Sequence, residues 1–120
     1  MPHPSFMLLH VDNPAASAEL YTSLLGCPPI EQSPGFALFA LESGLKLGLW
    51  SRHHVTPSAT PPGGAELGFP VGSDEMVTAL RHEWAGLGLQ ILQEPTAMEF
   101  GFTFTAADPD GHRLRVFAPT

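Results

Sequence analysis

The chain has few basic residues and no long apolar run. Of its 120 residues, five are Lys or Arg and twelve are Asp or Glu, so the formal net charge is −7. Nucleic acids and anionic membrane surfaces attract basic surfaces, so we expect neither as a partner. A membrane-spanning helix needs about 18 or more consecutive apolar residues. The sequence contains no such run.

Cysteine is scarce as well. Cys27 is the single cysteine, so an internal disulfide is excluded. The first five residues lack the basic-then-apolar pattern of a secretion signal. We therefore expect a cytoplasmic protein with a reduced thiol.

The hydrophobic fraction of 43% is that of an ordinary globular chain, and the length suits a single domain, residues 1–120.

The two halves of the chain contain the same signals in the same order. Three identical pairs lie sixty positions apart: Val11 and Val71, Leu20 and Leu80, Gly26 and Gly86. In each half an apolar run precedes a helix cap, Asn13 or Ser73, and glycine follows the helix. Residues 56–64 contain three prolines and two glycines and read as a linker. The order predicts two βαβββ modules, about 1–55 and 64–120.

The predicted strands cover residues 6–11, 36–41 and 45–50 in the first half, and 66–71, 90–93, 102–106 and 114–118 in the second. The first helix is expected to bury a face of Leu20, Tyr21, Leu24 and Leu25. The second is expected to bury a stripe of Val77, Leu80, Trp84 and Leu87.

Alternation along these strands separates two faces of each sheet, because successive side chains point to opposite sides. Leucine, phenylalanine and valine occupy the face that the helices must cover. The other face collects different residues: Lys46, Gly48, Trp50, Glu66, Gly68, Thr103, Thr105, Arg115 and Phe117.

This second face is either an ordinary solvated face or the lining of a pocket. Solvated faces are rich in charged and polar residues. Here charge is sparse, and glycines are expected to open space beside the ring of Trp50. An aromatic ring, small residues and a few polar groups are typical of a small-molecule pocket. The composition favours the pocket.

The duplicated βαβββ order, the opening run Phe6–Asp12 and the turn Asp108-Pro109-Asp110-Gly111-His112 resemble the vicinal oxygen chelate superfamily. This superfamily includes glyoxalase I, extradiol dioxygenases, fosfomycin resistance enzymes and bleomycin-binding resistance proteins. The resemblance covers essentially the whole chain. It implies an α+β fold, in which two βαβββ modules form curved mixed sheets around a shared cavity that dimerisation usually completes.

Enzymes of this superfamily hold a metal ion through four ligands, mostly His and Glu. The resemblance places the matching positions at Phe6, Gly48, Glu66 and Arg115. A divalent cation needs three or four oxygen or nitrogen donors, which one carboxylate beside a guanidinium does not supply. We therefore expect no metal, no other cofactor and no catalytic residue.

Leu49-Trp50-Ser51 and the segment from Glu94 to Gly101, followed by Thr103-Phe104, are similar to metal-free antibiotic-binding members, particularly phenazine-antibiotic resistance proteins. In those proteins a flat aromatic drug stacks on a tryptophan, and Trp50 holds the matching place. The ligand-binding residues we predict are Trp50, Glu66, Thr103, Thr105, Arg115, Phe6, Gly48 and Leu8.

Several roles stay open at this point. Trp50 stacks on a ligand or packs on a partner subunit. Glu66 and Arg115 should approach each other, either to present hydrogen-bonding groups to a ligand or to neutralise one another. Thr103 and Thr105 bond a ligand or merely suit a strand.

The main hypothesis is a metal-free homodimeric protein that binds a small aromatic or amphipathic molecule, such as a phenazine- or bleomycin-like antibiotic, and confers resistance by sequestration. One alternative is a metal-dependent lyase, isomerase or dioxygenase with a metal held by Glu66 and His10. Another is a dimeric interaction module that binds a protein.

Overall fold

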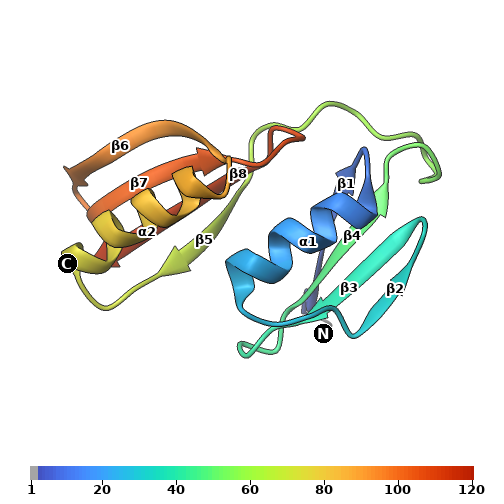
Figure 1. Cartoon of the computed structure of the whole chain (residues 1–120), viewed down its shortest axis with the longest axis horizontal. Coiled ribbons are helices and arrows are strands. Elements are labelled where there is room, and N and C mark those ends of the chain that lie inside the picture. The colour runs from blue at the N-terminus through green and yellow to red at the C-terminus, as the bar shows by residue number, and fades with distance from the viewer. Residues whose placement is uncertain (1–2) are drawn as a thin grey trace. The chain divides into compact units, whose positions relative to one another are not determined.

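The computed structural model describes residues 3–120, and the chain divides into two units between Pro61 and Pro62 (Figure 1). The first unit contains β1 (Phe6–Val11), α1 (Pro14–Leu25), β2 (Glu31–Ser33), β3 (Phe36–Ala40) and β4 (Lys46–Ser51). The second contains β5 (Glu66–Pro70), α2 (Asp74–Gly86), β6 (Gln90–Met98), β7 (Gly101–Ala107) and β8 (Arg113–Pro119).

Each unit builds a four-stranded mixed sheet with the same topology. The strand orders are β1-β4-β3-β2 and β5-β8-β7-β6. In each sheet the first and last strands of the unit pair in parallel, and the remaining neighbours are antiparallel. The expected α+β fold of two βαβββ units is confirmed.

The helix ends follow the predicted signals closely. Asn13 Oδ1 accepts a hydrogen bond from the backbone N–H of Ala16 at 3.2 Å, and Gly26 closes α1 in the left-handed conformation at φ 73°. In the second unit, Ser73 Oγ accepts from the N–H of Met76 at 3.3 Å. Gly86 lies inside the last turn of α2, and Gly88 takes the left-handed conformation instead. Neither helix of the described residues has the length and apolar character needed to cross a bilayer.

The core of each unit lies between its helix and one face of its sheet. Trp84 of α2 packs edge-on against Phe69 and Phe104, with ring centroids 5.2 and 5.4 Å apart, which confirms it as a core residue. Val77 is buried as predicted, whereas Leu80 is only half-buried and Leu87, at the C-cap, is exposed. The prediction for α1 was wrong in part. The helix buries Ser17, Ala18 and Tyr21, whereas its three leucines are only half-buried.

Two strand predictions differed from the structure. The three-residue strand β2 was missed because all its residues, Glu31–Ser33, are polar and exposed. Strand β6 runs on to Met98, well past the predicted end at Gln93. Register shifts after Ile91 and Gln93 interrupt its alternation, so the pattern expected of a regular strand is lost.

Candidate functional site

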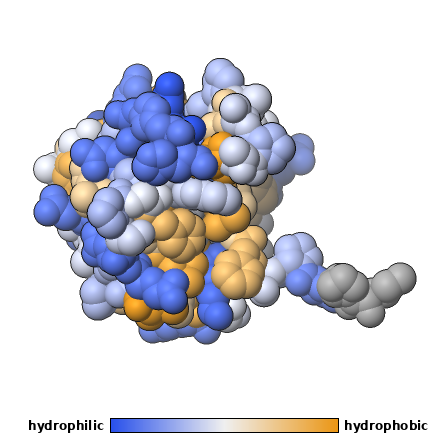
Figure 2. Space-filling model, turned by 90° about the vertical axis from the view of Figure 1, so that its right-hand side faces the viewer, coloured by the Kyte–Doolittle hydropathy of each residue, from blue (hydrophilic) through white to orange (hydrophobic). Residues whose placement is uncertain are grey.

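Each sheet has one face that is not covered by the helix of its unit. On the first sheet, in-register neighbours place side chains of β1, β4 and β3 together, and we call this set the first open face: Phe6, Leu8, His10, Phe36, Leu38, Lys46, Gly48 and Trp50. Figure 2 shows one side of the molecule, on which hydrophobic side chains gather among hydrophilic ones. Exposed large apolar residues of the first unit are Phe6, Leu8 and Ile30.

Trp50 lies in the middle of aromatic neighbours on the first open face. Its ring centroid is 6.3 Å from His10 and 6.4 Å from Phe36, with interplanar angles of 77° and 90°. Both neighbours therefore meet Trp50 at an edge-to-face angle, and its side chain is only half-buried. Trp50 lies away from Leu47 and Leu49, which are buried on the helix side.

The space expected over Gly48 is occupied. A Cβ atom on Gly48 would lie 2.5 Å from Leu8 Cδ2 and 3.1 Å from Phe36 Cζ. The glycine thus lets these two side chains approach the sheet. The expectation that it opens a gap beside Trp50 was wrong. At the start of β4, the Lys46 ammonium lies 5.4 Å from the centre of the Phe6 ring. Phe6 is 54% exposed.

Arg115 and Glu66 form a bidentate ion pair on the helix-free side of the second sheet. Arg115 Nε donates to Glu66 Oε1 at 2.9 Å, and Nη2 donates to Oε2 at 3.1 Å. The expected approach of these residues is confirmed. The hydrogen bonds from Arg115 hold the pKa of the Glu66 carboxyl below its ordinary value of 4.5, despite an opposing effect of burial.

Further hydrogen bonds tie Arg115 to β6 and β7. Arg115 Nη1 donates to Gln93 Oε1 at 3.0 Å and to Thr103 Oγ1 at 3.2 Å. Thr105 Oγ1 donates to the same Gln93 oxygen at 3.1 Å. Thr103 Oγ1 donates to the carbonyl of Val116 at 2.8 Å. The threonines are 0% and 2% exposed. Their hydroxyls therefore act within the sheet, and a ligand-binding role for them stays a prediction.

Sequence reasoning missed Gln93, Met98 and Phe100 on this side of the sheet. The Arg115 guanidinium lies 5.7 Å from the centre of the Phe100 ring, which meets Phe117 at 5.9 Å. Phe100 and Met98 are 42% and 44% exposed. Together with Glu66, Thr103, Thr105, Arg113, Arg115 and Phe117, these residues make up the second open face.

The residues at the family's metal positions do not fit a metal ion. Phe6 and Gly48 offer no donor, and both carboxylate oxygens of Glu66 are bonded to Arg115. That engagement also weakens the alternative in which Glu66 and His10 hold a metal. Within residues 3–120, no three His, Cys, Asp or Glu side chains are grouped to coordinate an ion. The donor set is therefore not that of the metal-dependent enzymes.

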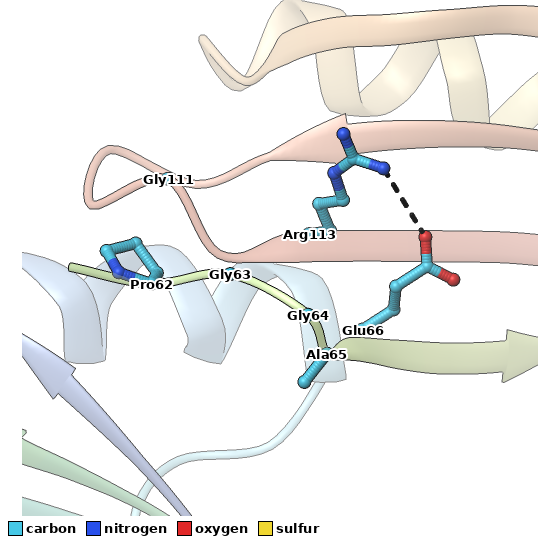
Figure 3. Close-up of a pocket in the computed structure, with 7 residues that line it drawn as sticks. All are labelled: Pro62, Gly63, Gly64, Ala65, Glu66, Gly111 and Arg113. Carbon is cyan, nitrogen blue, oxygen red and sulfur yellow. Dashed lines mark ion pairs between the residues drawn. The ribbon is translucent and has the colours of Figure 1, made fainter. Parts of the chain in front are cut away.

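A cavity of about 780 Å³ lies at the start of β5 (Figure 3). Its walls come from the segment before β5 and from the turn and strand next to it: Pro62, Gly63, Gly64, Ala65, Glu66, Gly111 and Arg113. Arg113 Nη1 lies 4.0 Å from Glu66 Oε2. A second cavity of about 430 Å³ is lined by Glu31, Gln32, Ser33 and Phe36 in the first unit.

Comparisons with known proteins agree with this architecture. A sequence model described as the glyoxalase/bleomycin resistance protein/dioxygenase superfamily matches residues 3–116. The phenazine antibiotic resistance protein EhpR of Enterobacter agglomerans is 29% identical over 116 residues, covering 94% of this chain and 89% of that protein.

Two solved structures show the same fold. Protein ATC0852 of Agrobacterium tumefaciens, determined by solution NMR, is 55% identical with a TM-score of 0.93, covering 100% of this chain and 99% of that one. A glyoxalase-related enzyme from Fulvimarina pelagi is 23% identical with a TM-score of 0.88, covering 98% and 88%.

Proposed function

The chain belongs to the glyoxalase/bleomycin resistance protein/dioxygenase superfamily, and from that membership we propose that it binds a small planar aromatic molecule without a metal ion. Its similarity to a phenazine antibiotic resistance protein supports an antibiotic resistance type of function. We infer that resistance arises by sequestration of a phenazine-like compound. Trp50 offers a surface for an aromatic ring, whereas the metal positions of the family lack the donors that its enzymes use.

The observation that carries this proposal is the setting of Trp50. Its ring is half-buried on the helix-free face, and His10 and Phe36 meet it at near-perpendicular angles. Neighbours at these angles hold the indole in place. An offset-stacked aromatic ligand would gain about 0.5–1.5 kcal/mol beyond area burial.

The electrostatics of Glu66 argue against acid–base catalysis by this residue. A general base or acid works best when its pKa lies near the operating pH. Arg115 shifts the pKa of Glu66 in the opposite direction, below 4.5. Glu66 is therefore a permanent anion at neutral pH, suited to holding Arg115 and poorly suited to moving protons.

Tryptophan fluorescence tests the proposal directly, because the chain has two tryptophans with different surroundings. Trp84 is 2% exposed in the core, so Trp84→Phe leaves Trp50 as the reporter. We expect phenazine to quench the fluorescence of W84F in the presence of EDTA. The matched variant W50F should bind phenazine several-fold more weakly by calorimetry, and its Trp84 emission should be quenched less than the Trp50 emission of W84F. Absence of both heat and quenching in W84F would refute the proposal, as would a stoichiometric metal in the purified protein.

The ion pair needs its own test, because it either contacts the ligand or only stabilises its sheet. Four N–H groups of Arg115 already donate to protein acceptors, out of the five that an arginine offers. We therefore expect the double variant E66Q/R115M to bind phenazine within about threefold of the wild type. A loss of tenfold or more would assign the pair to ligand contact.

A further inference from the structure

We propose that Met98 is a site of reversible oxidation by peroxide, and that the neighbouring Gln93 amide restricts the product to one of the two sulfoxide epimers. This inference goes beyond the proposed function and involves side chains of the second unit alone. Three observations support it: the exposure of Met98, the contacts of its sulfur atom and the fixed orientation of Gln93.

The Met98 side chain is open to solvent at the end of β6. It is 44% exposed, so dissolved peroxide reaches it. Met76, in the first turn of α2, is 48% exposed and gives a close comparison. Exposure alone therefore predicts that both methionines are oxidised, and that their surroundings decide any difference between the products.

The two sulfur atoms have different neighbours. Gln93 Nε2 donates to Met98 Sδ at 3.5 Å, and Arg115 Nη1 lies 4.0 Å from the same sulfur. A thioether sulfur is a weak acceptor, so the shorter contact with Gln93 dominates. Among residues 3–120, no donor is hydrogen-bonded to the sulfur of Met76. Only Met98 therefore carries an N–H group against one side of its sulfur.

The orientation of the Gln93 amide is fixed by its other contacts. Its Oε1 accepts from Arg115 Nη1 at 3.0 Å and from Thr105 Oγ1 at 3.1 Å. Arginine can only donate, so the amide oxygen must face Arg115 and the NH₂ group faces Met98. The donor beside the sulfur is thus held by a network that includes β7 and β8.

This arrangement affects the chemistry of oxidation. A lone pair of Met98 Sδ attacks one oxygen of hydrogen peroxide, and the O–O bond breaks. The transferred oxygen gives its proton to the leaving hydroxide, so the sulfide is oxidised to the sulfoxide and the peroxide is reduced to water. Sulfur has two lone pairs, and attack through one or the other gives opposite epimers. The Gln93 N–H engages one lone pair, so attack proceeds through the other.

The stereochemistry of the product also decides how it is reversed. Methionine sulfoxide reductases A and B each reduce one epimer. Oxidised Met98 should therefore be restored by one reductase and left largely oxidised by the other. Met76 sulfoxide should be a mixture that needs both.

Peroxide treatment of the native protein, followed by tryptic digestion and mass spectrometry, tests the proposal. Trypsin cleaves after Arg81 and so places Met76 and Met98 in different peptides. Portions of the digest are treated with one reductase or the other. We expect one reductase to restore about fivefold more Met98 than the other, the bias that one hydrogen bond gives. Met76 should respond about equally to both.

Gln93→Glu is the matched variant, because a carboxylate keeps an acceptor for Arg115 and Thr105 and lacks the N–H donor. Met98 in this variant should give both epimers in similar amounts. The wild type oxidised in urea should do the same, which controls for any preference of the reductases for the peptide sequence.

Each outcome bears on the proposal, and none depends on whether the protein binds phenazine. A native Met98 that resists peroxide while Met76 is oxidised would overturn the proposal. Equal amounts of both epimers at Met98 of the native wild type would overturn it too. A bias that persists in Gln93→Glu, with its fold verified by circular dichroism, would overturn the role of Gln93.

Discussion

At the scale of single residues, two arginine–glutamate pairs of the second unit offer a comparison. Both are bidentate, with donor–acceptor distances of 2.8–3.1 Å. The side chains of Arg115 and Glu66 are 19% and 33% exposed, whereas those of Arg81 and Glu94 are 26% and 66% exposed. Water competes less for the Arg115 pair. The loss of its carboxylate should therefore cost more than the loss of Glu94.

We predict that Glu66→Gln lowers the free energy of unfolding by about 1–3 kcal/mol, because Arg115 keeps its partly buried charge and loses its anionic partner. Glu94→Gln is the matched control and should cost clearly less than Glu66→Gln, as the loss of an exposed pair does. Urea unfolding followed by circular dichroism measures both. Equal losses in the two variants would contradict the prediction.

The lowered pKa of Glu66 also predicts a pH dependence. Its contribution to stability is present above its ordinary pKa of 4.5 and is lost as the pH falls through the lower pKa of the folded protein. Between pH 6 and pH 3, the urea midpoint of the wild type should fall more than that of Glu66→Gln. Parallel curves for the two proteins would show that the pair does not contribute.

Two glycines should respond differently to alanine. Gly101 has φ 148°, and its Cβ would collide with the backbone carbonyl of Ala118, which cannot move easily. We predict a cost of about 1–3 kcal/mol or more for Gly101→Ala. Gly48→Ala displaces the flexible ends of Leu8 and Phe36 and should cost less, while Trp50 emission changes through Phe36. Urea midpoints that fall in the opposite order would refute this comparison.

At the scale of elements, the sequence predicted most of the fold because its signals are local. Period-two alternation identified the helix-covered and open faces, and Trp50 lies on the open one. Asn13 and Ser73 predicted both helix starts.

The sequence did not predict the short polar strand β2, because this strand lacks an apolar pattern. The register shifts in β6 hid the place of Gln93, because a bulge changes which side a residue faces. The contacts of Gln93 with Arg115 depend on packing between strands, which a local pattern does not encode.

The helix caps give a prediction at this scale. Asn13→Ala and Ser73→Ala should each lower stability by about 1 kcal/mol, since each removes an acceptor for a backbone N–H in the first turn. Thr78→Ala, at an exposed position inside α2, is the control and should be neutral or slightly stabilising. Thermal unfolding followed by circular dichroism measures the melting temperature of each variant. Equal melting temperatures for all three variants would show that the caps do not stabilise the helices.

At the scale of the whole molecule, the two sheets leave four edge strands, β1, β2, β5 and β6. An edge strand presents unpaired backbone groups, and proteins usually protect it with proline, lysine, a bulge or a partner. Strands β5 and β6 contain Pro70 and Pro95, and β6 also has register shifts. Strand β1 reads Phe-Met-Leu-Leu-His-Val, without lysine or proline, and exposes Phe6 and Leu8 by 54% and 42%.

We therefore predict that the protein is a homodimer in solution and that β1 lies at its interface, because this edge combines unpaired backbone groups with exposed apolar side chains. Sedimentation velocity at micromolar concentration should show a dimer for the wild type. Phe6→Lys should shift it toward monomer, since a charge at the edge is costly to bury between two copies. Leu92→Lys, at an exposed apolar position of the already protected edge strand β6, is the control and should remain dimeric. A wild type that stays monomeric, or a dimer disrupted by Leu92→Lys and not by Phe6→Lys, would show that this edge is not the interface.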